Sequence, residues 1–169
     1  MKILKLELTN FACYYGDHII DLDTDDKKNV IIFIGSNGAG KTTIFNAINW
    51  ALYGEEYEKD LMKLKKRAIT DYVNETALED AYKENATADL LTTLYFEHDS
   101  KKYYITQYLE IKPVKEHNKS LRAEIKFRKT EMFNIMSDGD HVPIKYYNLL
   151  MDEILPNNVC AAPPFQDQF

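Results

Sequence analysis

The chain has 169 residues, of which 45% are apolar, and its formal net charge is −6 at pH 7. This length supports one domain with a hydrophobic core, and the apolar content excludes an intrinsically disordered chain. The acidic balance argues against a uniformly basic surface for nucleic acid, and no apolar run reaches the roughly 18 to 20 residues that span a bilayer, so no membrane partner is expected. Cys13 and Cys160 have no metal-ligand spacing, which favours reduced thiols and a cytoplasmic protein.

The chain begins with two predicted strands. Residues 3–9 alternate apolar and polar side chains, the period of a strand with one face in water. Residues 18–22 ("HIIDL") form the predicted partner strand across "CYYGD". The polar run "TDDKKN" is a turn that leads into an apolar third strand at residues 30–34.

A phosphate loop follows that third strand. Gly35, Gly40, Lys41 and Thr42 fit the pattern of Gly, four residues, Gly, Lys and Ser or Thr, at a transition from strand to helix. Glycines let consecutive N–H groups turn toward a phosphate, Lys41 supplies a mobile positive charge, and the Thr42 hydroxyl suits Mg²⁺. This context favours an ATP and Mg²⁺ site over a glycine turn with a solvated lysine. The predicted cofactor-binding residues are Gly35, Asn37, Gly38, Ala39, Gly40, Lys41, Thr42 and Thr43.

The next segment has helical spacing. Apolar residues recur three and four apart on one stripe, which comprises Ile44, Phe45, Ile48, Ala51 and Leu52. Gly54 is the predicted residue after the helix C-terminus. Trp50 and Tyr53 are interpreted as packing residues, with stacking on a nucleotide as the alternative.

The middle of the chain is predicted to be helical and then antiparallel. Residues 55–85 are charged and helical, with Leu61, Leu64, Ala68 and Ile69 on one side. Two strands then flank "HDSKK", and "SLRAEIKFRKT" and "MFNIM" continue the alternation until "SDGDH" turns the chain. The expected fold class is therefore mixed α/β (α+β), with an antiparallel sheet beside a strand, phosphate-loop and helix core.

Residues 146–154 ("YYNLLMDEI") resemble an apolar strand that ends in two acidic residues. As such a Walker B strand, the segment would offer Glu153 as a base that activates water. Its apolar residues nevertheless fall at helical intervals, and Pro156 would end a helix. We therefore predict a helix here and no confirmed catalytic residue in the chain.

Positive charge is concentrated in one part of the chain. Residues 101–130 carry 9 basic and 3 acidic side chains, whereas residues 1–100 carry 11 basic and 18 acidic ones. This segment, together with "KLKKR" at 63–67, is a candidate for phosphate contacts with DNA. The alternative is that these charges only form a solvated face.

Several motifs together resemble the N-terminal part of SMC/RecF-type ABC ATPases. They are the opening "LKLELTNFACYYGDHIIDL", the loop "GSNGAGKTT", the helix "FNAINWALYG", and the later "LYFEHDSKKYYI" and "DEILPNNV". Within that superfamily, the chain is most similar to DndD-type ATPases of DNA restriction and to Lamassu-type antiphage defence ATPases. The phosphate loop alone indicates only a P-loop NTPase, and the "L.NF..Y.G" opening narrows the resemblance.

The resemblance implies that residues 1–169 form the N-terminal lobe of an ATPase head. Its expected parts are strands, phosphate loop and helix (1–54), a charged helical excursion (55–90), antiparallel strands (91–145), and a helix with a possible Q-loop (146–169). The coiled coil and the C-terminal lobe, with its Walker B strand and Ser-Gly-Gly signature, are absent from this sequence. The implied partners are that lobe, a second head, double-stranded DNA and a nuclease or effector protein.

The implied role is restriction, antiphage defence or double-strand-break repair in a prokaryote, with hydrolysis incomplete in this chain alone. The resemblance would also make Gln166 or Gln168 a Q-loop glutamine, with Gln166 touching the metal. The ending "CAAPPFQDQF" departs from the DndD pattern, so a cut or altered end stays open. Two alternatives are a freestanding nucleotide-binding regulatory module and a small P-loop kinase. The kinase is disfavoured because the chain has only three arginines, Arg67, Arg122 and Arg128.

Overall fold

A computed structural model describes residues 1–25, 27, 29–115 and 120–155 of the chain. The strands are β1 (Lys2–Phe11), β2 (Tyr14–Asp21), β3 (Ala88–His98), β4 (Lys101–Lys115), β5 (Leu121–Ile135) and β6 (His141–Pro143). The helices are α1 (Lys41–Tyr53), α2 (Glu55–Asp60), the π-helical turn η1 (Leu61–Lys65), the 3₁₀ turn η2 (Ile69–Tyr72), α3 (Glu75–Lys83) and α4 (Tyr147–Ile154). In these described ranges, no helix has the length and apolar character needed to cross a membrane.

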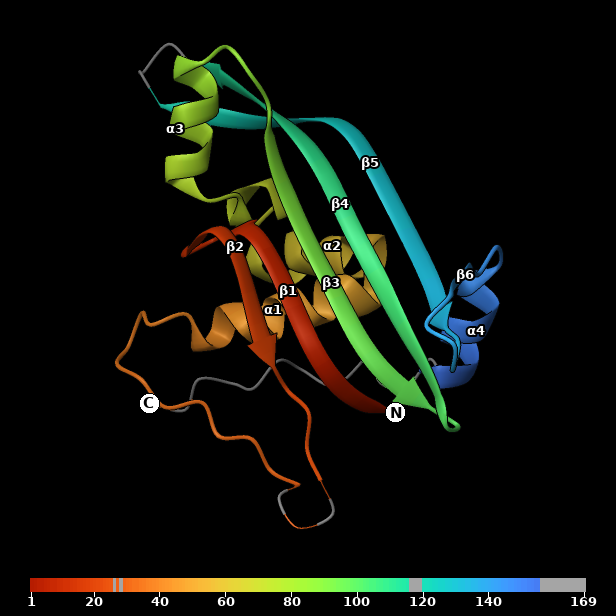
Figure 1. Cartoon of the computed structure of the whole chain (residues 1–169). Helices are drawn as coiled ribbons and strands as arrows, with labels where there is room; N and C mark the ends of the chain where they lie inside the picture. Colours follow the sequence, from red (N-terminus) through yellow and green to blue (C-terminus); the bar gives the residue numbers. More distant parts are fainter. Residues whose placement is uncertain (26, 28, 116–119, 156–169) are drawn as a thin grey trace.

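The strands form one antiparallel sheet in the order β2-β1-β3-β4-β5-β6 (Figure 1). β3 and β4 pair along the whole of β3, from Ala88 opposite Ile111 to His98 opposite Lys101. Their two-residue turn is Asp99 and Ser100, both with positive φ angles of 48° and 60°, as primed hairpin turns require. The predicted antiparallel middle and mixed α/β class are confirmed. The two predicted strands at 120–130 and 132–136 are a single strand, β5.

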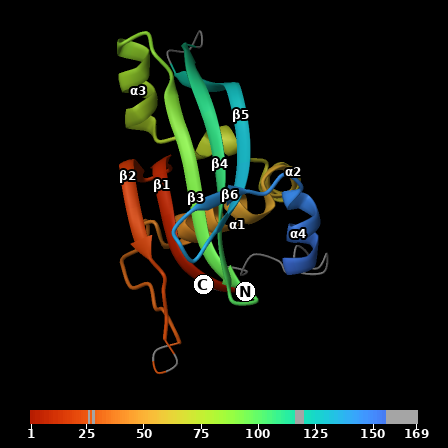
Figure 2. The ribbon, with the colours of Figure 1, turned by 45° about the vertical axis from the view of Figure 1, so that its right-hand side comes forward.

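Helix α1 lies across one face of the sheet (Figures 1 and 2), and the hydrophobic core lies between the two. Alternate side chains of β1, β3 and β4 point into it, and its largest fully buried side chain is Trp50. Phe11 packs against Trp50, with ring centroids 5.8 Å apart. The packing interpretation of Trp50 is therefore confirmed, since a fully buried indole has no face left for a nucleotide. Phe45, which belongs to the predicted apolar stripe of this helix, is 51% exposed and does not share the burial of Ile44 and Ala51.

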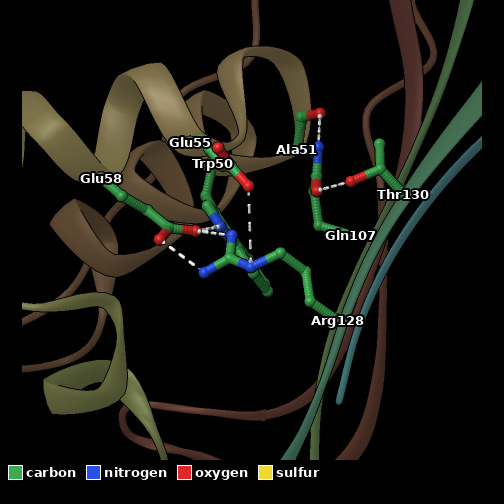
Figure 3. Close-up of polar contacts among 7 residues, drawn as sticks. All are labelled: Trp50, Ala51, Glu55, Glu58, Gln107, Arg128 and Thr130. Carbon is green, nitrogen blue, oxygen red and sulfur yellow. Dashed lines mark hydrogen bonds and ion pairs between the residues drawn. The ribbon is translucent and has the colours of Figure 1, made fainter. Parts of the chain in front are cut away.

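Polar contacts fasten the C-terminal end of α1 to β4 and β5 (Figure 3). Gln107 Nε2 donates to the Ala51 carbonyl at 3.3 Å, and Gln107 Oε1 accepts from Thr130 Oγ1 at 2.6 Å. A Cβ at Gly54 would lie only 2.9 Å from Gln107 Nε2, so a glycine directly after α1 lets the helix end approach β4. Gly54 N donates to the Trp50 carbonyl at 2.8 Å, and this confirms the predicted end of the helix.

A second contact joins α2 to both α1 and β5. Glu58 of α2 accepts from the Trp50 indole Nε1 at 2.9 Å and forms an ion pair with Arg128 of β5 (Figure 3). The two guanidinium bonds are 2.6 Å and 2.8 Å long. Such paired bonds fix geometry as well as charge. The excursion after α1 is therefore tied to β5 of the sheet.

The predicted strand at residues 30–34 does not form, and this part of the prediction is wrong. The segment is extended chain outside the sheet, and Val30, Ile32 and Ile34 are 71%, 74% and 91% exposed. A strand needs a neighbour for its backbone N–H and C=O groups, and none of the described strands lies beside this segment. An isolated apolar segment has no neighbouring strand with which to form backbone hydrogen bonds.

The segment that resembled a Walker B strand is the helix α4, as its spacing predicted. Met151 and Ile154 are buried against the core, and Asp152 and Glu153 are exposed. Of the residues predicted to share one side of the excursion, Leu61 and Ile69 are buried, whereas Leu64 is 65% exposed.

Candidate nucleotide site

The phosphate loop runs directly into the N-terminus of α1. Gly38 and Gly40 have φ angles of +84° and +88°, a region that residues with a Cβ rarely adopt. Gly40 is the N-cap residue, and its carbonyl accepts the first helical bond from Ile44 N at 3.1 Å. The N–H groups of the first turn have no partner within the helix, and they carry the positive end of the helix dipole. The loop therefore presents backbone donors to an anion.

Lys41 lies folded back over this loop. Its Nζ donates to the Gly35 carbonyl at 2.7 Å and to the Ser36 carbonyl at 2.8 Å. These bonds place a positive charge at the mouth of the loop, where a phosphate would meet both the ammonium group and the backbone N–H groups. The side chain of Thr42 is exposed next to it. A hydroxyl there is a hard oxygen ligand, which suits a Mg²⁺ ion that arrives with a nucleotide.

The turn between β1 and β2 lies against the phosphate loop. Tyr14 Oη donates to the Gly40 carbonyl at 3.5 Å, and Cys13 Sγ lies 3.9 Å from Thr43 Oγ1. A Cβ at Gly40 would be 2.7 Å from Cys13 Sγ and 2.9 Å from Tyr14 Oη. Only glycine fits at this position beside the turn. Burial is the main cause that raises the pKa of Tyr14, so its hydroxyl stays a neutral donor.

Cys13 and Tyr14 were not among the predicted site residues. The sequence did contain a sign of them, because the "L.NF..Y.G" opening includes Asn10, Phe11, Tyr14 and Gly16. Asn10 has a positive φ of 52°, its Oδ1 accepts from Gly16 N at 2.9 Å, and its Nδ2 donates to the Asp89 carbonyl at 2.9 Å. The motif therefore builds the hairpin turn that supports the loop.

Residues of the excursion also form hydrogen bonds to the turn between β1 and β2. Ala12 N donates to the Tyr72 carbonyl at 2.6 Å, and Asn74 Nδ2 donates to the Ala12 carbonyl at 2.6 Å. Asn74 Oδ1 also accepts from Ala77 N at 3.1 Å, as the N-cap of α3. The N-cap of α3 therefore also fixes the turn beside the phosphate loop.

The eight predicted phosphate-site residues lie together on one loop and the first turn of α1. Gln166 and Gln168 lie outside the described residues, and so does Cys160. Glu153 lies on α4 and is not part of the phosphate loop or of α1. Within the described ranges, no group of three or more His, Cys, Asp or Glu side chains could hold a metal ion.

Residues 5–161 match the family model described as an AAA domain. The chain belongs to the AAA domain family. With this family and the mixed α/β fold, the chain is a P-loop NTPase. The AAA domain match also covers the opening hairpin from Lys5 onward, the phosphate loop and α4, so the motifs that suggested the resemblance lie inside it except for Leu4.

Several curated proteins are similar to parts of this AAA domain. A subunit of the nuclease SbcCD from Staphylococcus saprophyticus is 40% identical over 60 residues, 36% of this chain and 6% of that protein. Exonuclease subunit 2 of Enterobacteria phage T4 is 31% identical over 107 residues, 62% of this chain and 16% of that protein. Arcadin-4 of Pyrobaculum calidifontis is 40% identical over 57 residues, 34% of this chain and 6% of that protein. The matched stretches thus span only a small part of each relative.

These similarities agree with the resemblance to the N-terminal part of SMC/RecF-type ABC ATPases. The narrower likeness to DndD-type and Lamassu-type ATPases stays a hypothesis.

Proposed function

We propose that this AAA domain is the ATP-binding lobe of a DNA-associated, SMC/RecF-like ATPase. The observation that carries the proposal is Lys41 at the mouth of a loop with two left-handed glycines, 2.7 Å and 2.8 Å from the loop carbonyls. Bound triphosphate would take over this ammonium group and the N–H groups of the first turn of α1. Mg²⁺ would take the Thr42 hydroxyl as one ligand.

Calorimetric titration with Mg²⁺-ATP tests the proposal. We expect Lys41→Ala to weaken binding about 10- to 100-fold, because a charged hydrogen-bond partner of the phosphates is lost. The matched control is Lys83→Ala on α3, a lysine whose ion-pair partner is Asp80 on the same helix. Equal affinity of Lys41→Ala and the wild type would overturn the proposal.

The exposed apolar segment at residues 30–34 is an argument for a second lobe that packs against it. Its apolar side chains lie in water next to the phosphate loop, and Phe33 packs edge-on against the half-exposed Phe45 at 6.1 Å. Apolar surface of this kind marks an interaction site in a stable protein. We infer that a C-terminal lobe of the same ATPase supplies a neighbouring strand here. Hydrogen exchange tests this inference, since the amides of residues 31–34 should gain protection only in the complete head.

The DNA partner and the biological role rest on the relatives and on charge. Two relatives are named as parts of a nuclease and of an exonuclease, which supports a DNA-processing assembly with a nuclease or effector partner. Two heads and double-stranded DNA would complete it. We extend this to prokaryotic restriction, antiphage defence or break repair in the cytoplasm, on the resemblance alone.

The basic segment at 101–130 does not offer one continuous surface for that DNA. Arg128 is paired with Glu58, and Lys129 is paired with Glu131 at 2.9 Å. Because successive residues of a strand point to opposite faces, Arg128 and Lys129 cannot contact one duplex together. Lys126 is exposed and forms no ion pair with a described residue. It is therefore the better candidate for a phosphate contact.

A further inference from the structure

The surface of α2 and η1 beside Arg128 contains a groove that the nucleotide site does not use. The groove has a volume of about 670 Å³ and is lined by Glu55, Glu58, Lys59, Met62, Lys63 and Arg128. Its base is fixed, because Glu58 and Arg128 hold each other in two hydrogen bonds (Figure 3). We call it the α2–η1 groove.

One wall of the α2–η1 groove is apolar. Met62 lines the groove and is 55% exposed, whereas the exposed Leu64 does not line it. Leu61 is buried and anchors this turn on the core. Met62 is therefore held in place by its neighbour. A methionine side chain adapts to differently shaped apolar partners.

The rim next to this wall is positively charged. Four exposed cations lie on η1 or directly after it, namely Lys63, Lys65, Lys66 and Arg67. Lys63 lines the groove, and none of the four forms an ion pair with another described residue. Their charges are thus available to a negatively charged ligand. Charge and apolar surface lie side by side within a few residues.

We propose that the α2–η1 groove is a docking site for an amphipathic helix of a partner protein, with one apolar anchor flanked by carboxylates. The anchor would lie against Met62, and the carboxylates would meet Lys63 and the cations after it. Helices that bind grooves use such anchors three or four residues apart, with charges that set orientation.

Duplex DNA fits this groove less well. A phosphate backbone presents an unbroken row of negative charge, and the groove includes Glu55, whose side chain is 69% exposed. The phosphate backbone would also leave Met62 in contact with charged groups. A helix can place single carboxylates at the cations and turn its apolar side to the methionine.

Trp50 provides a direct measurement of docking. It is the one tryptophan in the sequence, and its indole N–H donates to Glu58 at the base of the groove. The probe is a capped model helix of about 15 residues with one leucine near its centre and glutamates three and four residues to either side of it. We expect a saturable change in the Trp50 fluorescence of the 169-residue chain, and no change with a probe in which lysines replace the glutamates.

Two surface variants test the contacts. Met62→Gln removes the apolar wall, and Lys63→Glu reverses the rim charge. Each variant should bind the probe about tenfold more weakly or worse. Lys101→Glu, the same charge change at the start of β4, should leave binding as in the wild type. Circular dichroism checks that all three variants fold.

Three outcomes would overturn the proposal. The first is no binding of the glutamate probe, and the second is equal binding by wild type and Lys63→Glu. The third is saturable binding of a DNA duplex of about 20 base pairs that Lys63→Glu abolishes while the peptide fails to bind. That result would identify the groove as a phosphate surface. None of these results depends on whether the chain binds ATP.

Discussion

Arg128 on β5 and Glu58 on α2 form a two-bond ion pair between residues 70 positions apart, with bond lengths of 2.6 Å and 2.8 Å. The carboxylate has a side-chain exposure of only 16%, and it also accepts from the Trp50 indole. This carboxylate joins the excursion, the P-loop helix and the sheet. Loss of the Glu58 carboxylate should therefore weaken the packing of the excursion, of α1 and of the sheet.

We expect Arg128→Met to lower the free energy of unfolding by about 2 kcal/mol, because Glu58 would keep a partly buried charge without its cation. Urea denaturation measures this loss. The control is Lys129→Met on the opposite face of β5, whose pair with Glu131 has side-chain exposures of 50% and 39%. It should cost less than about 1 kcal/mol. Equal losses in the two variants would contradict a special role for the Glu58 pair.

The two left-handed glycines of the phosphate loop should respond differently to alanine. At Gly38 a Cβ would have nothing within 4 Å, whereas at Gly40 it would meet Cys13 Sγ at 2.7 Å. Both changes strain a positive φ, at a cost of about 1 to 3 kcal/mol. Gly40→Ala should lower the free energy of unfolding more than Gly38→Ala does, because its Cβ would also displace the β1–β2 turn. Thermal unfolding of both variants, and of Gly40→Ala combined with Cys13→Gly, tests this.

The combined variant removes one of the two contacts and should recover part of the lost stability. If Gly38→Ala and Gly40→Ala lose the same stability, the contact with the hairpin turn is not limiting.

Because of the hydrogen bond from Tyr108 to Asp89, the free energy of unfolding should depend on pH in the alkaline range. The bond is 2.7 Å long and raises the pKa of Tyr108 from 10.0 to about 12. Because the folded pKa is above the unfolded one, the stabilisation is complete below pH 10 and is lost as the pH rises to about 12. We expect the difference in unfolding free energy between wild type and Tyr108→Phe to be constant up to pH 10 and then to shrink.

Denaturation at intervals up to about pH 12 gives that difference. Tyr82→Phe serves as the control, since the Tyr82 hydroxyl forms no hydrogen bond with a described residue. A difference that stays constant to the highest pH would show that Tyr108 does not titrate in this way.

The chain alone should hydrolyse ATP no faster than its Lys41→Ala variant. Phosphoryl transfer depends on positioned charge and an oriented water, and α4 offers its two carboxylates on an exposed helix face. A phosphate-release assay measures the rate. Steady hydrolysis that disappears in Glu153→Gln would restore this residue as the base.

The sequence predicted the elements whose pattern is local. The alternation in β1 and the spacing of α1 each report a face that is buried by nearby residues, and both elements formed as expected. The spacing of α4 likewise favoured a helix over a Walker B strand, because its apolar residues are close enough in sequence to define one helix face.

The failures have a different physical cause. Residues 30–34 have the composition of a strand but no partner among the described strands. Arg128 looked like one cation in an alternating basic run, because its partner Glu58 is far away in sequence. Cys13 and Tyr14 carry no chemical pattern of their own, and they reach the site only through the hairpin that Asn10 builds.

The order of the strands also bears on how the chain folds. Each described strand pairs with its neighbour in sequence except where β1 lies beside β3, as in Thr9 opposite Leu91. Closing that loop of about 80 residues costs about 4 kcal/mol of chain entropy before its contacts form, so this pairing should be the slow step. The P-loop helix lies inside the loop. We therefore expect the hairpins on either side to form first and affinity for phosphate to appear last, so that a partly folded chain would not yet capture nucleotide.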